Sequence, residues 1–390
     1  LMFNETETLP KGEFDRTLEE AGAESNASTW LDFTQYNISA PSSQLPLLVK
    51  LESDRMHRLV LKQPQLESEI EVVANERRYR VDDDVEGTVN ELLWKTAFEK
   101  HSYHWPTIGW MEDIVSFTTE DCEAFYRTYY APNNATVVLV GDFDSAEALS
   151  AISQAYGPLK AADLPLEDVH PEPPQLVERH LELTKPTLTE KLTLGYRGPA
   201  LGDADHIPAN LLTEVLFGGR AARIYKKLVR ELELATDVRM SVGPFRDPGL
   251  IELYATAREG HTAEELLTVI DSELERVRQE PISQPEIERA RARFELGLLH
   301  GLETADSKAQ TIGFYDCVLG KPAAAFERLD ALELVTRDDL LRVARRYLDP
   351  NTRTKVIVRA SGEPPAEGSS EDELEDNEAD EFDATEGANA

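Results

Sequence analysis

The segment Glu69-Ile70-Glu71-Val72-Val73-Ala74-Asn75-Glu76-Arg77-Arg78 contains the most information about fold and chemistry. Glu69 and Glu76 are seven residues apart. Because seven residues are close to two helical turns, both carboxylates would point to one side of a helix, about 10 Å apart along its axis. A carboxylate kept beside an apolar stripe needs a cation, a metal or a hydrogen-bonded network. The alternative is a solvated helix edge, with both carboxylates in water and the two following arginines beside them.

An internal repeat lies further along the chain. Residues 118–140 align without a gap on residues 336–358, and nine of the positions are identical in the two copies: Thr118, Asp121, Arg127, Tyr129, Pro132, Asn133, Thr136, Val138 and Val140 in the first. Each copy predicts a helix, a Pro-Asn turn and a β-branched strand. Chance likeness of two such units is the alternative, and the gap-free identities argue against it. A repeat with so long a period indicates duplicated domains rather than a solenoid.

The composition places the domain boundaries. Prolines cluster with acidic residues over 158–185, which predicts an extended linker at 158–179 between a first domain at 1–157 and a second at 180–360. The segment 363–386 contains twelve acidic residues and no basic one, so 361–390 is predicted to be a disordered acidic tail.

Hydrophobic periodicity predicts an α+β fold in which helices pack against an antiparallel-rich sheet. Helices are expected at Ser42–Leu59, Gln65–Arg80, Asp205–Phe217, Ala263–Gln279 and Gln284–His300. Strands are expected at Val137–Gly141, Glu190–Tyr196, Leu250–Thr256 and Lys355–Arg359.

Charge and length exclude several functional classes. The net charge of −34 argues against nucleic acid as a partner, since phosphate binding needs basic patches. No run approaches the roughly 20 apolar residues of a membrane-spanning helix. The two cysteines, Cys122 and Cys317, favour separate thiols over a disulfide framework.

Several segments, in order, resemble the pitrilysin/insulinase (M16, inverzincin) family of zinc metallopeptidases. The family motif H-x-x-E-H is followed after about 75 residues by a helix E-x-x-x-V-x-x-E, whose last Glu is the third metal ligand. Glu69 to Glu76 matches that helix. Further matching segments are Leu1–Thr6, Pro10–Asp15, Asn26–Tyr36 (N-A-x-T-x-x-D-x-T-x-Y), Leu51–Met56, Thr107–Gly109 with Glu112–Ile114, and Tyr129–Thr136. None of the eight histidines forms H-x-x-E-H, and counting back from Glu76 puts its second His just before Leu1. We therefore expect an N-terminally truncated fragment that begins directly after the motif and is inactive alone.

The resemblance implies two homologous domains in a clamshell-type arrangement, the second being a non-catalytic copy without a metal. It implies a zinc-dependent endopeptidase in which Zn²⁺ is held by two His and Glu76, while Glu69 orients a ligand or assists the base. Asn26, Ala27 and Ser28 would lie in an active-site strand, to which a peptide substrate would add as a further strand. The residues that follow, from Thr29 to Tyr36, are also expected to form a strand.

Three further motifs are interpreted with the family in mind. Gly218-Gly219 is followed by basic residues but lacks a phosphate-loop pattern, so nucleotide binding is rejected. Arg230 matches a family Arg that holds the substrate carbonyl, but Thr236 stands where the partner Tyr is expected, so a surface ion pair with Glu231 or Glu233 is an equal alternative. His101 and His104 have the spacing of a metal pair, and a structural role is favoured.

A non-catalytic M16-like partner or scaffold subunit is the alternative function, and a homodimer or a paired M16 homologue is the expected assembly. The residues that precede Leu1 would decide between the two functions. The compartment stays open, with a bacterial periplasmic or secreted location favoured.

Overall fold

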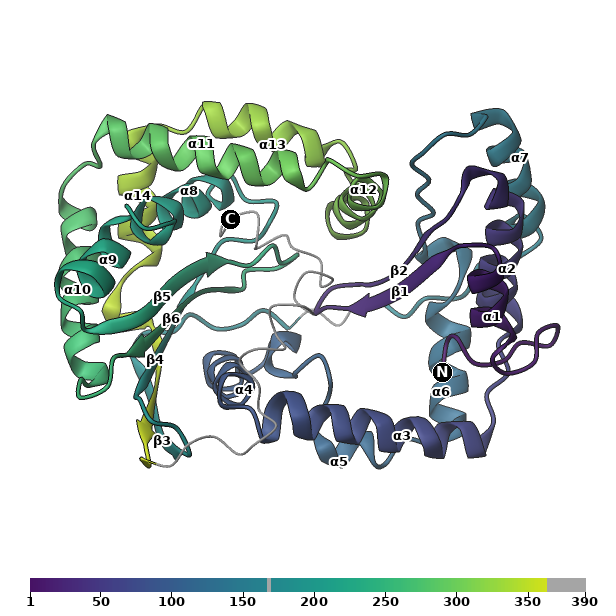
Figure 1. Ribbon diagram of the computed structural model, residues 1–390, viewed down its shortest axis with the longest axis horizontal. Helices are drawn as coiled ribbons and strands as arrows, with labels where there is room; N and C mark the ends of the chain where they lie inside the picture. Colours follow the sequence, from purple (N-terminus) through teal and green to yellow (C-terminus); the bar gives the residue numbers. More distant parts are fainter. Residues whose placement is uncertain (167–169, 363–390) are drawn as a thin grey trace. The chain divides into compact units, whose positions relative to one another are not determined.

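The computed structural model describes residues 1–166 and 170–362, so the predicted acidic tail from 363 onward lies outside the described residues. The described chain forms two compact units (Figure 1). Unit 1 contains 1–77, 107–166 and 304–322, and unit 2 contains 78–106, 170–303 and 323–362. Each unit thus combines segments from both halves of the chain, and the continuous domains 1–157 and 180–360 stay a prediction. The α+β class is confirmed.

Unit 2 is built on a five-stranded sheet with the order β3-β7-β4-β6-β5. The strands are β3 (Arg179–Lys185), β4 (Lys191–Arg197), β5 (Ala235–Val242), β6 (Leu250–Ala257) and β7 (Thr354–Ala360). Only the β3–β7 pair is parallel. Predicted strands at 190–196, 250–256 and 355–359 are therefore confirmed to within one or two residues.

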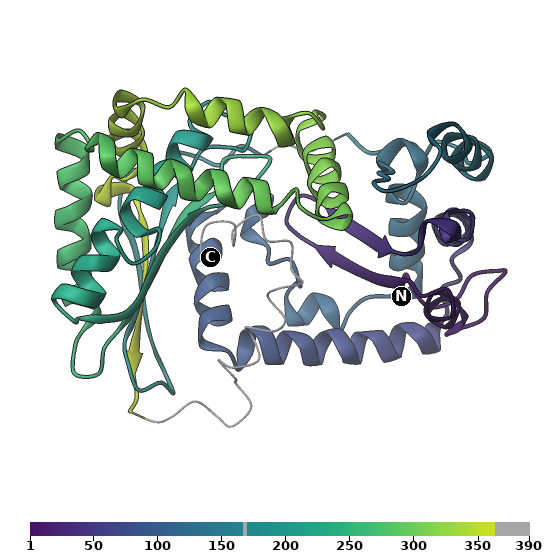
Figure 2. The same cartoon turned by 45° about the horizontal axis from the view of Figure 1, so that its top comes forward.

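Helices cover both faces of this sheet (Figure 2). One face packs against helices that share a single apolar core with the strands. The other face packs against α4 (Val85–Ala97), whose Leu93 lies 3.1 Å from where a Cβ of Gly195 on β4 would be. Because both faces are covered, five successive residues of β4 are buried. The helices of unit 2 besides α4 are α8 (His206–Phe217), α9 (Arg223–Tyr225), α10 (Ala263–Gln279), α11 (Gln284–His300), α13 (Ala324–Glu333) and α14 (Arg337–Tyr347), with the π-helices η2 (Arg78–Asp82) and η5 (Lys226–Glu231) and the 3₁₀ turns η3 (Ser102–His104) and η6 (Pro350–Thr352).

Unit 1 is mainly helical and contains a two-stranded antiparallel hairpin, β1 (Glu24–Thr29) with β2 (Thr34–Ser39). The expected single strand from Thr29 to Tyr36 is wrong, because the Trp30 N–H donates to the Phe33 carbonyl at 2.9 Å and closes a turn there. The helices are α1 (Glu13–Glu20), α2 (Leu45–Arg58), α3 (Gln63–Arg77), α5 (Met111–Ile114), α6 (Thr119–Tyr129), α7 (Ser145–Tyr156) and α12 (Ala305–Leu319), with 3₁₀ turns η1 (Ser42–Gln44) and η4 (Pro132–Asn134). No helix among the described residues is long and apolar enough to cross a membrane.

The two repeat copies begin in the same way. Thr118 caps α6 and Thr336 caps α14, each in a reciprocal capping box with the Asp three residues later. A 3₁₀ turn at the Pro-Asn pair follows in both copies. Only the second copy continues into a strand, β7, so the predicted strand at Val137–Gly141 is wrong. A strand needs a neighbour for its backbone groups, and β7 has β3 and β4, whereas 137–141 pairs with no strand among the described residues.

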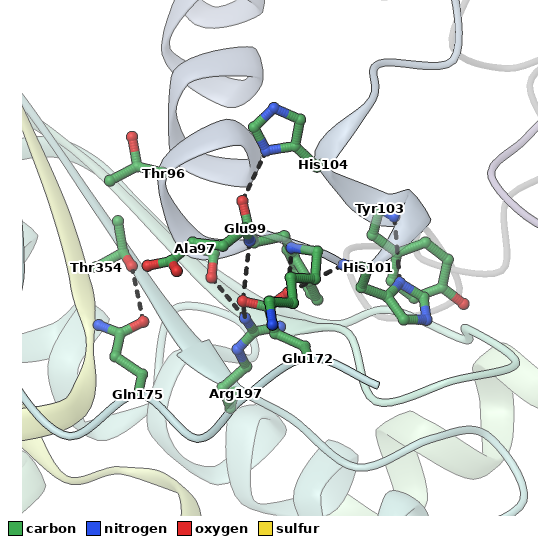
Figure 3. A network of polar contacts seen from close by, with 12 residues as sticks. Thr96, Ala97, Glu99, His101, Tyr103, His104, Glu172, Gln175, Arg197 and Thr354 are labelled. Atoms are coloured by element: carbon green, nitrogen blue, oxygen red, sulfur yellow. Dashed lines mark hydrogen bonds and ion pairs between the residues drawn. The ribbon is translucent and has the colours of Figure 1, made fainter. Parts of the chain in front are cut away.

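Residues 158–166 and 170–178 of the predicted linker contain no helix or strand, and the part from 170 onward is fixed to unit 2 by polar contacts (Figure 3). The Glu172 carboxylate accepts the backbone N–H groups of Glu99, Lys100 and His101 at 2.9, 2.8 and 3.0 Å, and it pairs with Arg197 at 3.2 Å. Three successive N–H donors around one anion form a nest for negative charge. Glu172 thereby holds the turn after α4 against β4, which contains Arg197.

We expect Glu172→Ala to lower the free energy of unfolding of unit 2 by about 3 kcal/mol, because it leaves Arg197 and three backbone donors without their buried partner. Native-state hydrogen exchange of amides in β3 and β4 measures this change. The matched control is Asp163→Ala, an exposed acidic residue of the same linker, for which a change under about 0.5 kcal/mol is expected. Equal effects of the two substitutions would contradict the anchoring role.

The contribution of Glu172 to the free energy of unfolding of unit 2 should also depend on pH. Burial works against its charged form, but the three N–H donors and Arg197 outweigh burial and hold the pKa of Glu172 below its usual value of 4.5. A pKa lowered by folding gives stability that is present above the unfolded-state pKa and is lost as the pH falls through the folded-state value. The stability difference between the unsubstituted chain and Glu172→Gln should therefore be constant near neutral pH and shrink below pH 4.5. A difference that grows on acidification would contradict it.

Candidate functional site

Helix α3 presents Glu69 and Glu76 on one flank. Its buried stripe contains Leu66, Ala74 and Arg77, and at 100° per residue both carboxylates lie at roughly 90 to 110° from the centre of that stripe. The Glu69 side chain is 36% exposed and Glu76 is exposed. The predicted common face is thus confirmed as a geometric feature, at the border between the buried stripe and solvent.

The start of the chain lies beside this flank. The amine of Leu1 is 3.8 Å from Oε2 of Glu69. The backbone of the segment then pairs with the end of α2 and the residues after it, since the Val60 N–H donates to the Glu5 carbonyl and the Glu7 N–H to the Arg58 carbonyl, both at 2.9 Å. A residue joined to the Leu1 amine would therefore be next to Glu69.

Two charged residues of the family segment Leu51–Met56 explain why the N-terminal segment packs against α2. Asp54 is buried, and its Oδ2 accepts from the hydroxyls of Thr6 at 2.5 Å and Thr8 at 2.6 Å, while its Oδ1 pairs with Arg58 at 3.2 Å. The neighbouring Arg55, also buried, stacks its guanidinium 3.9 Å from the centre of the Tyr36 ring. Two charged residues of one motif thus hold the N-terminal segment and β2 onto α2.

The predicted substrate residues lie in β1. Asn26, Ala27 and Ser28 pair in antiparallel register with Asn37, Tyr36 and Gln35 of β2. Asn26 is exposed, and the other two are half-buried. Within the part of the chain that the structure describes, β1 has β2 as its one strand partner, so its other edge is not occupied by a strand.

Arg230 is exposed on η5 and donates to the Arg220 carbonyl at 3.4 Å. The alternative of an ion pair with Glu231 or Glu233 is wrong, because Glu231 pairs with Lys226 at 3.1 Å and Glu233 with Arg258 at 3.3 Å. Thr236, in the place of the expected Tyr, is exposed at the start of β5. A substrate-binding role for Arg230 stays a prediction.

The two histidines with metal-like spacing are engaged in local structure. Nδ1 of His101 accepts the Tyr103 N–H at 3.2 Å, and Nδ1 of His104 lies 2.7 Å from the Phe98 carbonyl (Figure 3). Nε2 of His101 is 3.4 Å from Asp247. Each ring thus fixes the turn after α4, in agreement with the favoured structural role.

Arg77 is the residue near the site that sequence reasoning missed. The alternative of a solvated helix edge put it beside the carboxylates in water, but it is buried, and its Nη1 donates to the Gly109 carbonyl at 2.8 Å. The signal was present in the spacing, because Arg77 follows Ala74 by three residues and Leu66 by eleven and so falls on the apolar stripe.

The donor set fits zinc in part. Carboxylate oxygen is a normal zinc ligand, and Glu69 and Glu76 provide two carboxylates on one flank of one helix. Among residues 1–166 and 170–362 no group of three or more His, Cys, Asp or Glu side chains could hold a metal ion. The described residues therefore supply at most part of a zinc centre, and further ligands would have to come from elsewhere.

The model of the insulinase (M16) peptidase family matches residues 1–109, and the model of the M16 peptidase inactive domain matches residues 116–294. The chain belongs to peptidase family M16.

Similar proteins and solved structures support membership of this family. The chain is 29% identical to the zinc protease PqqE of Helicobacter pylori, covering 92% of this chain and 81% of that protein. It is 26% identical to an uncharacterised zinc protease of Mycobacterium tuberculosis, covering 92% and 82%. A crystal structure of a protease from Helicobacter pylori matches with a TM-score of 0.87 and 28% identity over 92% of this chain and 86% of that one. A peptidase M16 inactive domain from Pseudomonas fluorescens shares the fold, with a TM-score of 0.82 and 18% identity over 93% and 87%.

We expect residues 1–390 alone to show no specific zinc stabilisation, because the described residues provide too few ligands. About a tenfold excess of Zn²⁺ should raise the melting temperature no more than the same excess of Mg²⁺, which controls for loose binding to the acidic surface. A zinc-specific rise, or zinc that stays bound through gel filtration, would show that this chain contains a complete site.

Proposed function

We propose that this chain is the part of a zinc-dependent endopeptidase that contains the third metal ligand, Glu76. The observation that supports the proposal is the common flank of Glu69 and Glu76 on α3, with the Leu1 amine 3.8 Å from Glu69. The proposal requires two histidines from an H-x-x-E-H motif directly before Leu1. In that position they would be next to the same flank.

Zinc, when bound in such a site, acidifies a coordinated water and polarises the scissile carbonyl. The role proposed for Glu76 is to donate a carboxylate oxygen to the metal from an exposed position, where a water and a peptide can reach it. Glu69 is more shielded and lies nearer the start of the chain, so its proposed role is to accept a hydrogen bond from a ligand ring or to assist the base.

Peptide binding is proposed for the outer edge of β1. An extended peptide can form main-chain hydrogen bonds to Asn26, Ala27 and Ser28 without a particular sequence, which suits cleavage of unfolded segments. The hairpin is held from its other side, since Gln35 of β2 donates to Gln310 of α12 at 2.8 Å and Phe33 contacts Phe314 at 5.4 Å between ring centres. A braced strand loses less entropy when it binds a peptide than a mobile strand would.

A second candidate is a non-catalytic M16 subunit that acts as partner or scaffold, either in a homodimer or with a homologue. The match of residues 116–294 to the inactive domain of the family favours it. The gene sequence before Leu1 separates the two candidates: an intact H-x-x-E-H supports the peptidase, and a motif lacking one His or the Glu supports the partner.

In a protein that includes H-x-x-E-H, Glu76→Gln should lose most bound zinc and at least about tenfold in peptide cleavage, because a neutral amide is a poor replacement for the carboxylate ligand. The matched control is Glu71→Gln on the same helix, which is also exposed but is 140° around the axis from Glu76. Zinc content by elemental analysis and cleavage of an unstructured peptide are the two measurements.

Zinc loss and activity loss that are equal for Glu71→Gln and Glu76→Gln would show that the metal-facing side of α3 has been assigned wrongly. If the unsubstituted protein binds zinc fully but cleaves no unstructured peptide, that result would contradict the endopeptidase function and favour a role as a partner subunit.

A further inference from the structure

The segment Thr107–Ile114 matches the family, yet the proposed chemistry gives it no role. In unit 1 it contacts the C-terminal end of α3 through Arg77. The guanidinium donates from Nη1 to the Gly109 carbonyl at 2.8 Å and lies 5.8 Å from the centre of the Trp110 ring. The short helix α5 begins at Met111, directly after these two residues, and packs against α3.

The conformation of Gly109 supports this contact. Its φ is +87°, in the left-handed region that favours glycine. Ile114, almost fully buried, is 3.6 Å from where a Cβ of residue 109 would be, so the turn packs closely on the helix that follows. The carbonyl that receives Arg77 is thus part of a fixed turn rather than a mobile loop.

Arg77 is also the last α-helical residue before the backbone changes to the π-helix η2. A change from α to π repeat alters the rotation per residue, and such changes are frequent at functional sites. A helix that changes its repeat directly after Arg77 needs a fixed point near Glu76, because one residue of slippage rotates each side chain by about 100°. The buried contact of Arg77 with Gly109 provides that point one residue from Glu76.

The opposite end of α3 is fixed by separate contacts. The side-chain amide of Gln65 donates to Glu5 at 2.9 Å, and Lys62 pairs with Glu5 at 2.7 Å. Glu76 is more than ten residues from those contacts, whereas Arg77 is adjacent to it. Of these two anchors of α3, Arg77 is therefore the nearer to Glu76.

We propose that Arg77 is a positioning residue for the metal ligand: its hydrogen bond to Gly109 and its contact with Trp110 fix the rotation of the last turn of α3, so that the Glu76 carboxylate keeps its direction. This inference rests on the proposed function, in which Glu76 binds zinc. Arg77 itself touches neither metal nor substrate, and its effect is exerted through Glu76.

The test uses the protein that includes H-x-x-E-H and measures its zinc affinity by competition with a chromophoric chelator, together with the melting temperature of the metal-free form. Arg77→Met keeps the apolar stem and removes the donors, and it should weaken zinc binding by about 10- to 100-fold. Arg77→Lys, which can still donate to the Gly109 carbonyl, should recover a large part of the affinity. Arg78→Met is the matched control, an exposed arginine one residue later, and should leave the affinity unchanged within about twofold.

The outcomes separate this inference from the proposed function. No zinc binding by the unsubstituted protein would overturn both. Normal zinc binding that is unchanged in a folded Arg77→Met variant would overturn the positioning role alone, even if its melting temperature falls, since that result describes a purely structural arginine. If Arg77→Met does not fold, Trp110→Leu decides, because it removes the ring that lies 5.8 Å from the Arg77 guanidinium. A folded Trp110→Leu variant with weakened zinc binding and a near-normal melting temperature of the metal-free form supports the inference, and an unchanged affinity overturns it.

Discussion

The fixed rotation of α3 is the constraint on which the candidate site depends. The Glu69 and Glu76 side chains keep their direction only while the helix cannot rotate or slide, because a shift of one residue rotates each side chain by about 100° around the helix axis. Contacts of Glu5 with Lys62 and Gln65 fix one end, and the contact of Arg77 with Gly109 fixes the other. Family segments far apart in sequence thus act together on one helix.

Carboxylates with little exposure accept hydrogen bonds from arginines and backbone groups in a chain with a net charge of −34. Glu172 is held by Arg197 and three backbone N–H groups, and Asp205 accepts from Arg346 and Tyr347 at 2.8 and 3.0 Å. Hydrogen bonds that favour a charged carboxylate outweigh its burial, so the pKa values of both acids lie below their usual range. Removal of one partner from such a group costs more than the pair itself contributes, since it leaves the other charge buried alone.

The helices could be predicted from sequence because their signals are local. Hydrophobic periodicity predicted helices at 263–279 and 284–300, with the boundaries that α10 and α11 have in the structure. Strands depend on distant partners, and here local pattern failed twice. Residues 137–141 have the composition of a strand but pair with no described strand, and the segment Thr29–Tyr36 contains a turn that β-propensity does not indicate. The linker was predicted to be extended, but its anchoring by Glu172 could not be predicted, because the N–H groups that donate to Glu172 are some 70 residues away in sequence.

The site shows the same division between local and distant information. Spacing alone placed Glu69 and Glu76 on one flank, whereas the burial of Arg77 depends on a turn at Gly109, 32 residues further along. The repeat gives the clearest comparison. Thr118 with Asp121 and Thr336 with Asp339 form the same capping box, so both copies keep the same local signal for the start of a helix. A strand follows the turn only in the second copy, where β7 pairs with β3 and β4. Differences between the two copies therefore arise from what packs against each of them, and a local sequence match is evidence for a shared element but not for a shared function.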